Sequence, residues 1–231
     1  MNKLALATLA LTMGFFVSKA QAVEFDADVP QALQQQVLGD LAFIKSIQGT
    51  KASSLHKQIY GDVSGSAYDT FFTTRVLRVG YDDQMSGGAV AYVSPMMDSE
   101  KMYFTQNYTG FSHPQIARLM VVFHEARHTE TKNRFWMHAT CPTPFKDDQG
   151  NEVKSIWTGL PLAGQPGCDS TAFGAYGSST IMMKNVSLFC DNCTSKVKMD
   201  AGIYSDDQLN RLLPADARNQ IRKDVVAAQL Q

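Results

Sequence analysis

The stretch VVFHEARHTE, from Val121 to Glu130, governs the interpretation of the whole sequence. Two histidines, His124 and His128, stand four residues apart, and Glu125 directly follows the first. Because an α-helix has 3.6 residues per turn, residues four apart lie on one face, one turn apart. A helix over this stretch therefore directs both imidazoles to one place, with Glu125 about 100° round the helix beside them.

The residues before the motif indicate that this helix is buried. Ser112 and Pro114 predict its start, and we expect it to end near Glu130. A buried His-Glu-x-x-His group without a metal leaves polar side chains unpaired, which costs free energy. We therefore favour a metal site over a purely structural helix, and neutral imidazoles at this spacing suit zinc. The apolar residues that precede the motif and indicate burial are Ile116, Leu119, Met120, Val121, Val122 and Phe123.

Glu125 is the expected acid–base group of such a site. Zinc lowers the pKa of a water towards neutrality, and a glutamate beside the ion can take the proton and later pass it to a leaving amine. The pattern of His124, Glu125 and His128 resembles the zincin metallopeptidases. That resemblance implies an edge strand above the helix that pairs with extended substrate, for which AVAYVSP (89–95) and KMYFTQNY (101–108) are both candidates.

The third metal ligand separates the zincin subfamilies, and none matches fully. Metzincins have a glycine three residues after the second histidine and a ligand six after it, positions that Thr131 and Arg134 occupy here. Gluzincins use a later glutamate. The stretch GCDSTAFGAYG (167–177) resembles the aspzincin element in part, with Asp169 seven residues before Tyr176 rather than three. Seven residues make about two helical turns, so Asp169 and Tyr176 would share one helix face. We therefore expect Asp169 to bind the metal and Tyr176 to steady the oxyanion.

Other residues remain candidates for these roles. His138 follows His128 by ten residues and could supply the third ligand or support one, and a glutamate is a further alternative. A helix cap beside a disulfide is the alternative role for Asp169. Arg127 is the alternative to Tyr176 at the oxyanion.

Four cysteines in an exported chain favour disulfides. Cys141 lies just beyond the motif helix and Cys168 directly precedes Asp169, so we expect a bridge that ties this aspartate to the metal helix. Cys190 and Cys193 form a CxxC, for which a short structural disulfide at a helix end is favoured. A redox centre in a thiol–disulfide protein is the alternative.

Export is indicated by the first 22 residues. Lys3, the apolar run from 4 to 17 and the Ala20-Gln21-Ala22 site predict a signal peptide cleaved after Ala22. No later run is long enough to span a membrane, and a net charge of −1 without a basic block indicates no nucleic-acid partner. We expect a periplasmic or secreted protein in which residues 23–231 form one domain, with the oligomeric state open.

The remaining patterns predict an α+β fold. Apolar spacing predicts a helix over 28–47, and β-branched and aromatic residues predict strands over 70–81, 89–95 and 101–108, with a turn at 86–88. A second core helix is expected over 169–189, and a helical tail over 205–230 with a break near Pro214. The expected architecture is zincin-like: a small antiparallel or mixed sheet packed on the motif helix, the second core helix and the C-terminal helical tail.

The expected function follows from these residues. We expect an exported zinc-dependent metallopeptidase with one Zn²⁺ per chain that hydrolyses peptide or other amide bonds in a peptide or protein substrate. The alternative is a zincin-like binding or structural protein with little or no turnover.

Overall fold

The computed structural model describes residues 23–85 and 88–231, so the expected signal peptide and two residues of the expected turn lie outside it. The chain order is β1 (Glu24–Phe25), α1 (Gln31–Ser46), α2 (Ser54–Ile59), α3 (Gly65–Thr73), β2 (Arg78–Asp82), β3 (Ala91–Ser94), β4 (Asp98–Thr105), α4 (Asn107–Gly110), α5 (Gln115–Arg127), the 3-10 segment η1 (Thr131–Trp136), α6 (Ala175–Phe189), α7 (Ser195–Leu209) and α8 (Ala215–Gln229).

The four strands form one small mixed sheet in the order β1-β2-β4-β3. β2 runs parallel to β1 and to β4, whereas β3 runs antiparallel to β4. The expectation of an α+β fold with a small mixed sheet is confirmed. β3 lies at one end of the sheet, where Tyr92 pairs with Tyr103 of β4 and the two rings stack 5.0 Å apart. Its other side carries no strand among the described residues.

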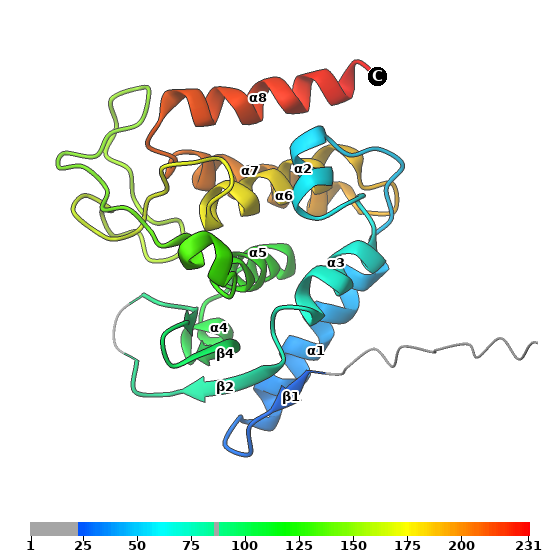
Figure 1. Ribbon diagram of the computed structural model, residues 1–231, viewed down its shortest axis with the longest axis vertical. Helices are drawn as coiled ribbons and strands as arrows, with labels where there is room; N and C mark the ends of the chain where they lie inside the picture. The colour runs from blue at the N-terminus through cyan, green and yellow to red at the C-terminus, as the bar shows by residue number, and fades with distance from the viewer. Residues whose placement is uncertain (1–22, 86–87) are drawn as a thin grey trace, which may run out of the picture.

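Helix α5, which carries the motif, lies at the centre of the molecule (Figure 1). The sheet lies on one side of it and α6 and α7 on the other, with α8 outermost. Its apolar residues are buried as expected, which explains why this short segment is helical in a layered fold. The helix begins after Pro114 without a side-chain cap, so the expected cap from Ser112 is wrong, and it ends at Arg127 with His128 as its C-cap.

The expected strand over 70–81 is wrong in its first half. Residues up to Thr73 belong to α3, and only Arg78–Asp82 forms a strand. The side chain of Ser64 accepts a hydrogen bond from the backbone N–H of Ala67 and starts that helix. Tyr68, Phe71 and Phe72 recur at helical spacing on its buried face. Burial of that face outweighs the strand preference of the aromatic and β-branched residues.

The second core helix starts later than expected. Helix α6 begins at Ala175, and Asp169 lies in the loop before it. One carboxylate oxygen of Asp169 accepts hydrogen bonds from the backbone N–H groups of Tyr176, at 2.7 Å, and Gly177, at 3.2 Å. Asp169 therefore caps α6, so the expectation that Asp169 and Tyr176 share one helix face is wrong.

The C-terminal third is helical, as expected, but its boundaries differ. Helix α7 begins at Ser195, where the side chain of Thr194 caps it, and α8 follows the break at Pro214. No helix of the described residues combines the length and apolar character that crossing a bilayer requires.

Both expected disulfides are present. Cys141 is bonded to Cys168, and Cys190 is bonded to Cys193. Cys190 is fully buried at the end of α6. Cys193 is partly buried, so thiol–disulfide exchange at its sulfur remains the redox alternative.

Candidate metal centre

Three imidazole rings converge beside α5. The Nε2 atoms of His124, His128 and His138 lie 3.1 to 3.3 Å from one another. His124 and His128 come from the last turn of α5, and His138 comes from the segment that follows η1. These three residues are a group able to hold a metal ion.

The hydrogen bonds on the far sides of two rings determine which nitrogens are protonated. Nδ1 of His128 lies 2.7 Å from the backbone carbonyl of Phe135, and Nδ1 of His138 lies 2.9 Å from a carboxylate oxygen of Asp169. Both partners only accept, so each Nδ1 carries the hydrogen. A neutral imidazole has one hydrogen, so the two Nε2 atoms face each other at 3.1 Å with bare lone pairs. Two lone pairs repel, and a cation between them removes that repulsion.

The donor set fits zinc. Nitrogens bound about 2.0–2.1 Å from a tetrahedral Zn²⁺ are roughly 3.3 Å apart, close to the separations observed among the three Nε2 atoms. Three neutral imidazoles leave one position open on a four-coordinate ion, as catalytic zinc sites require. The second hydrogen bond on each of His128 and His138 is the arrangement that orients histidine ligands in zinc sites.

The backbone before His138 explains how this residue reaches the site. Arg134, Phe135 and Trp136 all adopt left-handed conformations, with φ of 50°, 58° and 49°. Such conformations cost on the order of 1–3 kcal/mol each for residues with a side chain. The turn they make brings the Phe135 carbonyl to His128 and then directs the chain back towards α5. Backbone strain is therefore concentrated in the segment that completes the metal group.

Glu130 stabilises this turn. One carboxylate oxygen accepts hydrogen bonds from Arg75, at 2.9 and 3.0 Å, and from Arg127, at 2.5 Å. The other accepts from the indole of Trp136, at 2.7 Å, and from the amide of Asn133, at 3.0 Å. Burial alone would raise the pKa of Glu130, but these donors and the arginine charges lower it below its ordinary value. The ionised carboxylate thus links α5, α3 and the left-handed turn.

Asp169 lies behind the metal group rather than in it. Its two oxygens are already used, one by His138 and the other by the N-terminus of α6. The third member of the group is therefore His138, where Asp169 was expected. Asp169 has the alternative role, that of a cap for helix α6. The backbone of Ala139 pairs with that of Cys168 through hydrogen bonds of 2.7 and 3.1 Å, which holds His138 and Asp169 side by side.

Burial governs the protonation of the site. It lowers the pKa of His124 well below its ordinary value, helped by the charges of the other two histidines and Arg211, and lowers the pKa of His128 to about 4. Both rings are therefore neutral near pH 7 and able to bind a metal. Burial also raises the pKa of Glu125 to about 8, although the backbone N–H of Val93 donates a hydrogen bond to its carboxylate.

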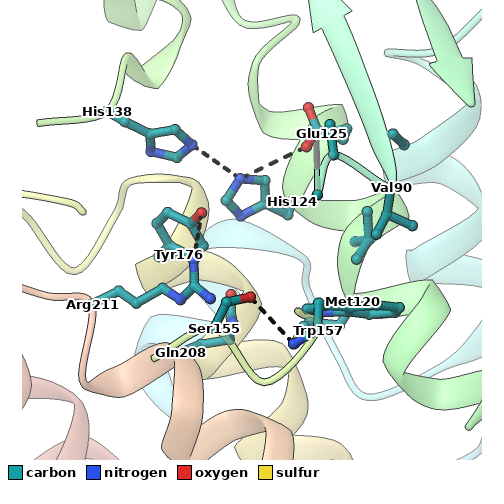
Figure 2. A pocket seen from close by; sticks show the side chains of 14 residues that line it. Val90, Met120, His124, Glu125, His138, Ser155, Trp157, Tyr176, Gln208 and Arg211 are labelled. Carbon is teal, nitrogen blue, oxygen red and sulfur yellow. Dashed lines mark hydrogen bonds and ion pairs between the residues drawn. The ribbon is translucent and has the colours of Figure 1, made fainter. Parts of the chain in front are cut away.

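The metal group opens into a pocket of about 220 Å³ (Figure 2). Glu125 lies at its rim, 3.9 Å from Nε2 of His124. The wall opposite the histidines is apolar, with Val90, Met120 and Trp157. Ala91 of the edge strand β3 lines the pocket together with Glu125, so this strand borders the pocket.

Comparisons with protein-family models, curated proteins and solved structures found no match. The arrangement of the pocket is therefore the evidence for its function.

Tyr176 lines the pocket. Its ring contacts His124 and stacks on His138, with centroids 4.3 and 4.6 Å apart. Nη1 of Arg211 donates to its hydroxyl oxygen at 2.9 Å, so the hydroxyl hydrogen remains available to another acceptor. Burial raises the pKa of Tyr176, which keeps that hydrogen in place.

Two pocket residues escaped the sequence analysis, and one candidate is excluded. Arg127 donates to Glu130 and to the Phe173 carbonyl and does not line the pocket, so it does not reach an oxyanion there. Arg211 and Trp157 line the pocket instead. Neither belongs to a local motif, and only the tertiary structure brings them to α5.

Proposed function

We propose that this chain is an exported zinc-dependent hydrolase of peptide or other amide bonds, of the zincin type, in which His124, His128 and His138 hold the ion. The observation that carries the proposal is the pair of bare Nε2 lone pairs of His128 and His138, which face each other and a third imidazole beside Glu125. When bound there, zinc polarises a substrate carbonyl and makes water acidic near neutral pH.

The chain supplies the other parts of the reaction. A cation held by the three histidines would favour the ionised form of Glu125, whose pKa burial otherwise raises to about 8. The carboxylate then takes a proton from the attacking water and passes it to the leaving amine as the carbon–nitrogen bond breaks. Tyr176 donates its free hydroxyl hydrogen to the oxyanion that develops on the carbonyl oxygen. Because the side chains of His124 and Glu125 are only 8% and 12% exposed, polar interactions beside them act in a medium of lower dielectric constant than water, where they are stronger.

The surroundings are consistent with a peptide substrate. The free side of β3 borders the pocket, and an extended peptide can add to a strand edge through main-chain hydrogen bonds. This supports β3, within AVAYVSP, over β4 as the substrate strand, since β4 has neighbours on both sides. The two disulfides support an oxidising compartment, in line with the export signal expected over 1–22.

Metal content and hydrolysis together test the proposal. Protein purified with its disulfides intact should contain about one zinc per chain by elemental analysis, lose peptide cleavage with a chelator and regain it with added zinc. Cleavage is followed by mass spectrometry on a mixture of peptides.

Glu125→Gln should keep the zinc and lower the rate of cleavage by about 10²–10⁴-fold, because the amide cannot take a proton. The matched control is Glu152→Gln, which changes a half-exposed glutamate that does not line the pocket. Zinc without cleavage of any peptide would instead support the binding-protein alternative, and absence of zinc would overturn the proposal.

A further inference from the structure

Arg211 places a positive charge inside the pocket. It follows the C-terminus of α7, and its backbone carbonyl accepts a hydrogen bond of 2.9 Å from the N–H of Asp169, which fixes it beside the metal centre. The residue is only 5% exposed, and its side chain extends across the pocket below Tyr176 (Figure 2). The guanidinium carbon lies 4.7 Å from the centre of the Tyr176 ring.

Most of the hydrogen-bonding capacity of this guanidinium is unused. Among the described residues, the Tyr176 hydroxyl is its one hydrogen-bond acceptor, and Nε is buried without any partner. The nearest carboxylate oxygen, on Asp207, lies 3.6 Å from Nε, beyond hydrogen-bond distance. That oxygen already accepts a hydrogen bond of 2.8 Å from Gln208. A buried charge with unused donors is costly unless a ligand supplies the acceptor.

Two other arginines of low exposure each donate to a carboxylate within hydrogen-bond distance. Arg118 donates to both carboxylate oxygens of Asp40, at 2.7 and 2.8 Å. Arg127 donates to Glu130 at 2.5 Å. Arg211 differs in having its closest carboxylate out of hydrogen-bond reach, although it is as buried as Arg127. The acids whose charges act on Tyr176, Glu125 and Asp169, have other partners or roles: Asp169 contacts His138 and the start of α6.

We propose that Arg211 determines substrate specificity by binding a carboxylate of the substrate, so that the enzyme cleaves amide bonds next to a residue with a carboxylate. This inference rests on the proposed function. An arginine presents paired N–H donors to a carboxylate. Here Nη2 has no hydrogen-bond partner among the described residues, and Nη1 has one N–H to offer beyond the one donated to Tyr176, whereas Nε is buried on the side of Asp207. The carboxylate is either a peptide C-terminus or an acidic side chain.

The shape of the pocket agrees with a ligand of this kind. Val90, Met120 and Trp157 form an apolar wall that suits the rest of the bound residue. The volume of about 220 Å³ is below the roughly 300–1,000 Å³ of pockets that enclose whole drug-sized ligands, so it holds part of a substrate. Tyr176 lies between Arg211 and the histidines (Figure 2). The Arg211 guanidinium is therefore separated from the reacting carbonyl by the ring of Tyr176.

Four peptides separate the two sources of the carboxylate. The first pair is acetyl-Ala-Ala-Phe-Ala with a free C-terminal carboxylate and the same peptide as a C-terminal amide. The second pair consists of C-terminal amides in which the phenylalanine is replaced by glutamate or by glutamine. We expect the zinc-loaded protein to cleave the acid of at least one pair with a KM about 10- to 100-fold lower than that of its neutral counterpart, as for a charged hydrogen bond.

Arg211→Gln should abolish this difference by raising KM for the acid to that of its neutral counterpart, whereas the loss of its hydrogen bond to Tyr176 should lower kcat equally for acid and neutral peptides. Arg211→Lys should keep part of the preference, because lysine retains the charge without the paired donors. The control is Arg222→Gln, an exposed arginine on α8 whose loss should change nothing. A fall of kcat for all four peptides with the KM preference for the acid retained would show that Arg211 only holds Tyr176, and would overturn the proposal.

Binding supplies a readout that does not need turnover. The same peptides are titrated by calorimetry into zinc-loaded Glu125→Gln protein, with and without Arg211→Gln. Equal affinity for acid and amide in both pairs, or a preference that survives Arg211→Gln, would overturn the role of Arg211 even if the enzyme hydrolyses peptides. Absence of zinc and of all cleavage would overturn the proposed function instead, so the two failures are distinguishable.

Discussion

Oδ1 of Asp169 lies 2.9 Å from Nδ1 of His138, on the side of the ring away from His124 and His128. This carboxylate keeps the hydrogen of His138 on Nδ1 and leaves the lone pair of Nε2 able to bind a metal ion. Its other oxygen caps α6. One buried side chain therefore links the orientation of a metal ligand to the start of the second core helix.

The first prediction concerns this link. Asp169→Asn should lower zinc affinity by about 10- to 100-fold, the usual effect of removing a residue that orients a ligand. His138→Ala should lower it further, because a ligand itself is lost. Competition with a chromophoric chelator measures both. If Asp169→Asn removed zinc completely while His138→Ala retained it, Asp169 would be the third ligand and our assignment would be wrong.

The second prediction concerns Glu130. Glu130→Gln leaves Arg75 and Arg127 without their charged partner and weakens the contacts to Trp136. Removing one partner of a fully buried ion pair costs about 3–5 kcal/mol, so we expect about 2–3 kcal/mol here, since Arg75 is partly exposed. Urea unfolding of the metal-free protein measures the change.

Zinc affinity should fall in the same variant, because the turn that presents the Phe135 carbonyl to His128 loses its anchor. Glu152→Gln is the control, since its ion pair with Lys154 is half-exposed and should contribute little. A stable Glu130→Gln protein with unchanged zinc affinity would show that the left-handed turn keeps its conformation without the Glu130 carboxylate.

The third prediction concerns His56, a fully buried histidine outside the metal centre. Its ring nitrogens contact the Gly61 carbonyl and the Tyr68 hydroxyl, each at 2.8 Å, and burial lowers its pKa from 6.5 to about 4. Below pH 6.5 the unfolded chain therefore takes up a proton that the folded protein refuses. The free energy of unfolding should fall as the pH drops from about 6.5 to about 4, by about 1.4 kcal/mol per pH unit.

A variant without this imidazole isolates its contribution. Between pH 7 and pH 5, metal-free His56→Gln protein should lose about 2 kcal/mol less stability than the metal-free parent, as measured by urea unfolding at both pH values. The histidines of the metal centre titrate in both proteins and cancel in the comparison. Equal losses would mean that His56 is protonated in the folded state.

The fourth prediction separates the two disulfides. Replacing Cys141 and Cys168 by serine should lower stability by about 2–4 kcal/mol and also lower zinc affinity, because the bridge lies beside the backbone pair that holds His138 next to Asp169. Replacing Cys190 and Cys193, at the other end of α6, should leave zinc affinity unchanged. Equal effects on zinc affinity would indicate a general loss of stability rather than a local one.

Parts of the fold could be predicted because their patterns have a single interpretation. The apolar spacing before the motif fits only a helix, and both α1 and α5 form close to where it indicates. The pattern over 70–81, by contrast, has two interpretations. Its aromatic and β-branched residues suit a strand locally, yet Tyr68, Phe71 and Phe72 also fit a helix face, and packing against the core favours the helix.

The sequence by itself determined the pair of imidazoles and their glutamate, because helical periodicity places His124, Glu125 and His128 whatever surrounds them. Only the tertiary structure decided what joins them. The left-handed turn at Arg134–Trp136 and the pairing of Ala139 with Cys168 bring in His138, and the end of α7 brings in Arg211. These contacts depend on loop conformations and on packing between distant segments, which no local periodicity encodes.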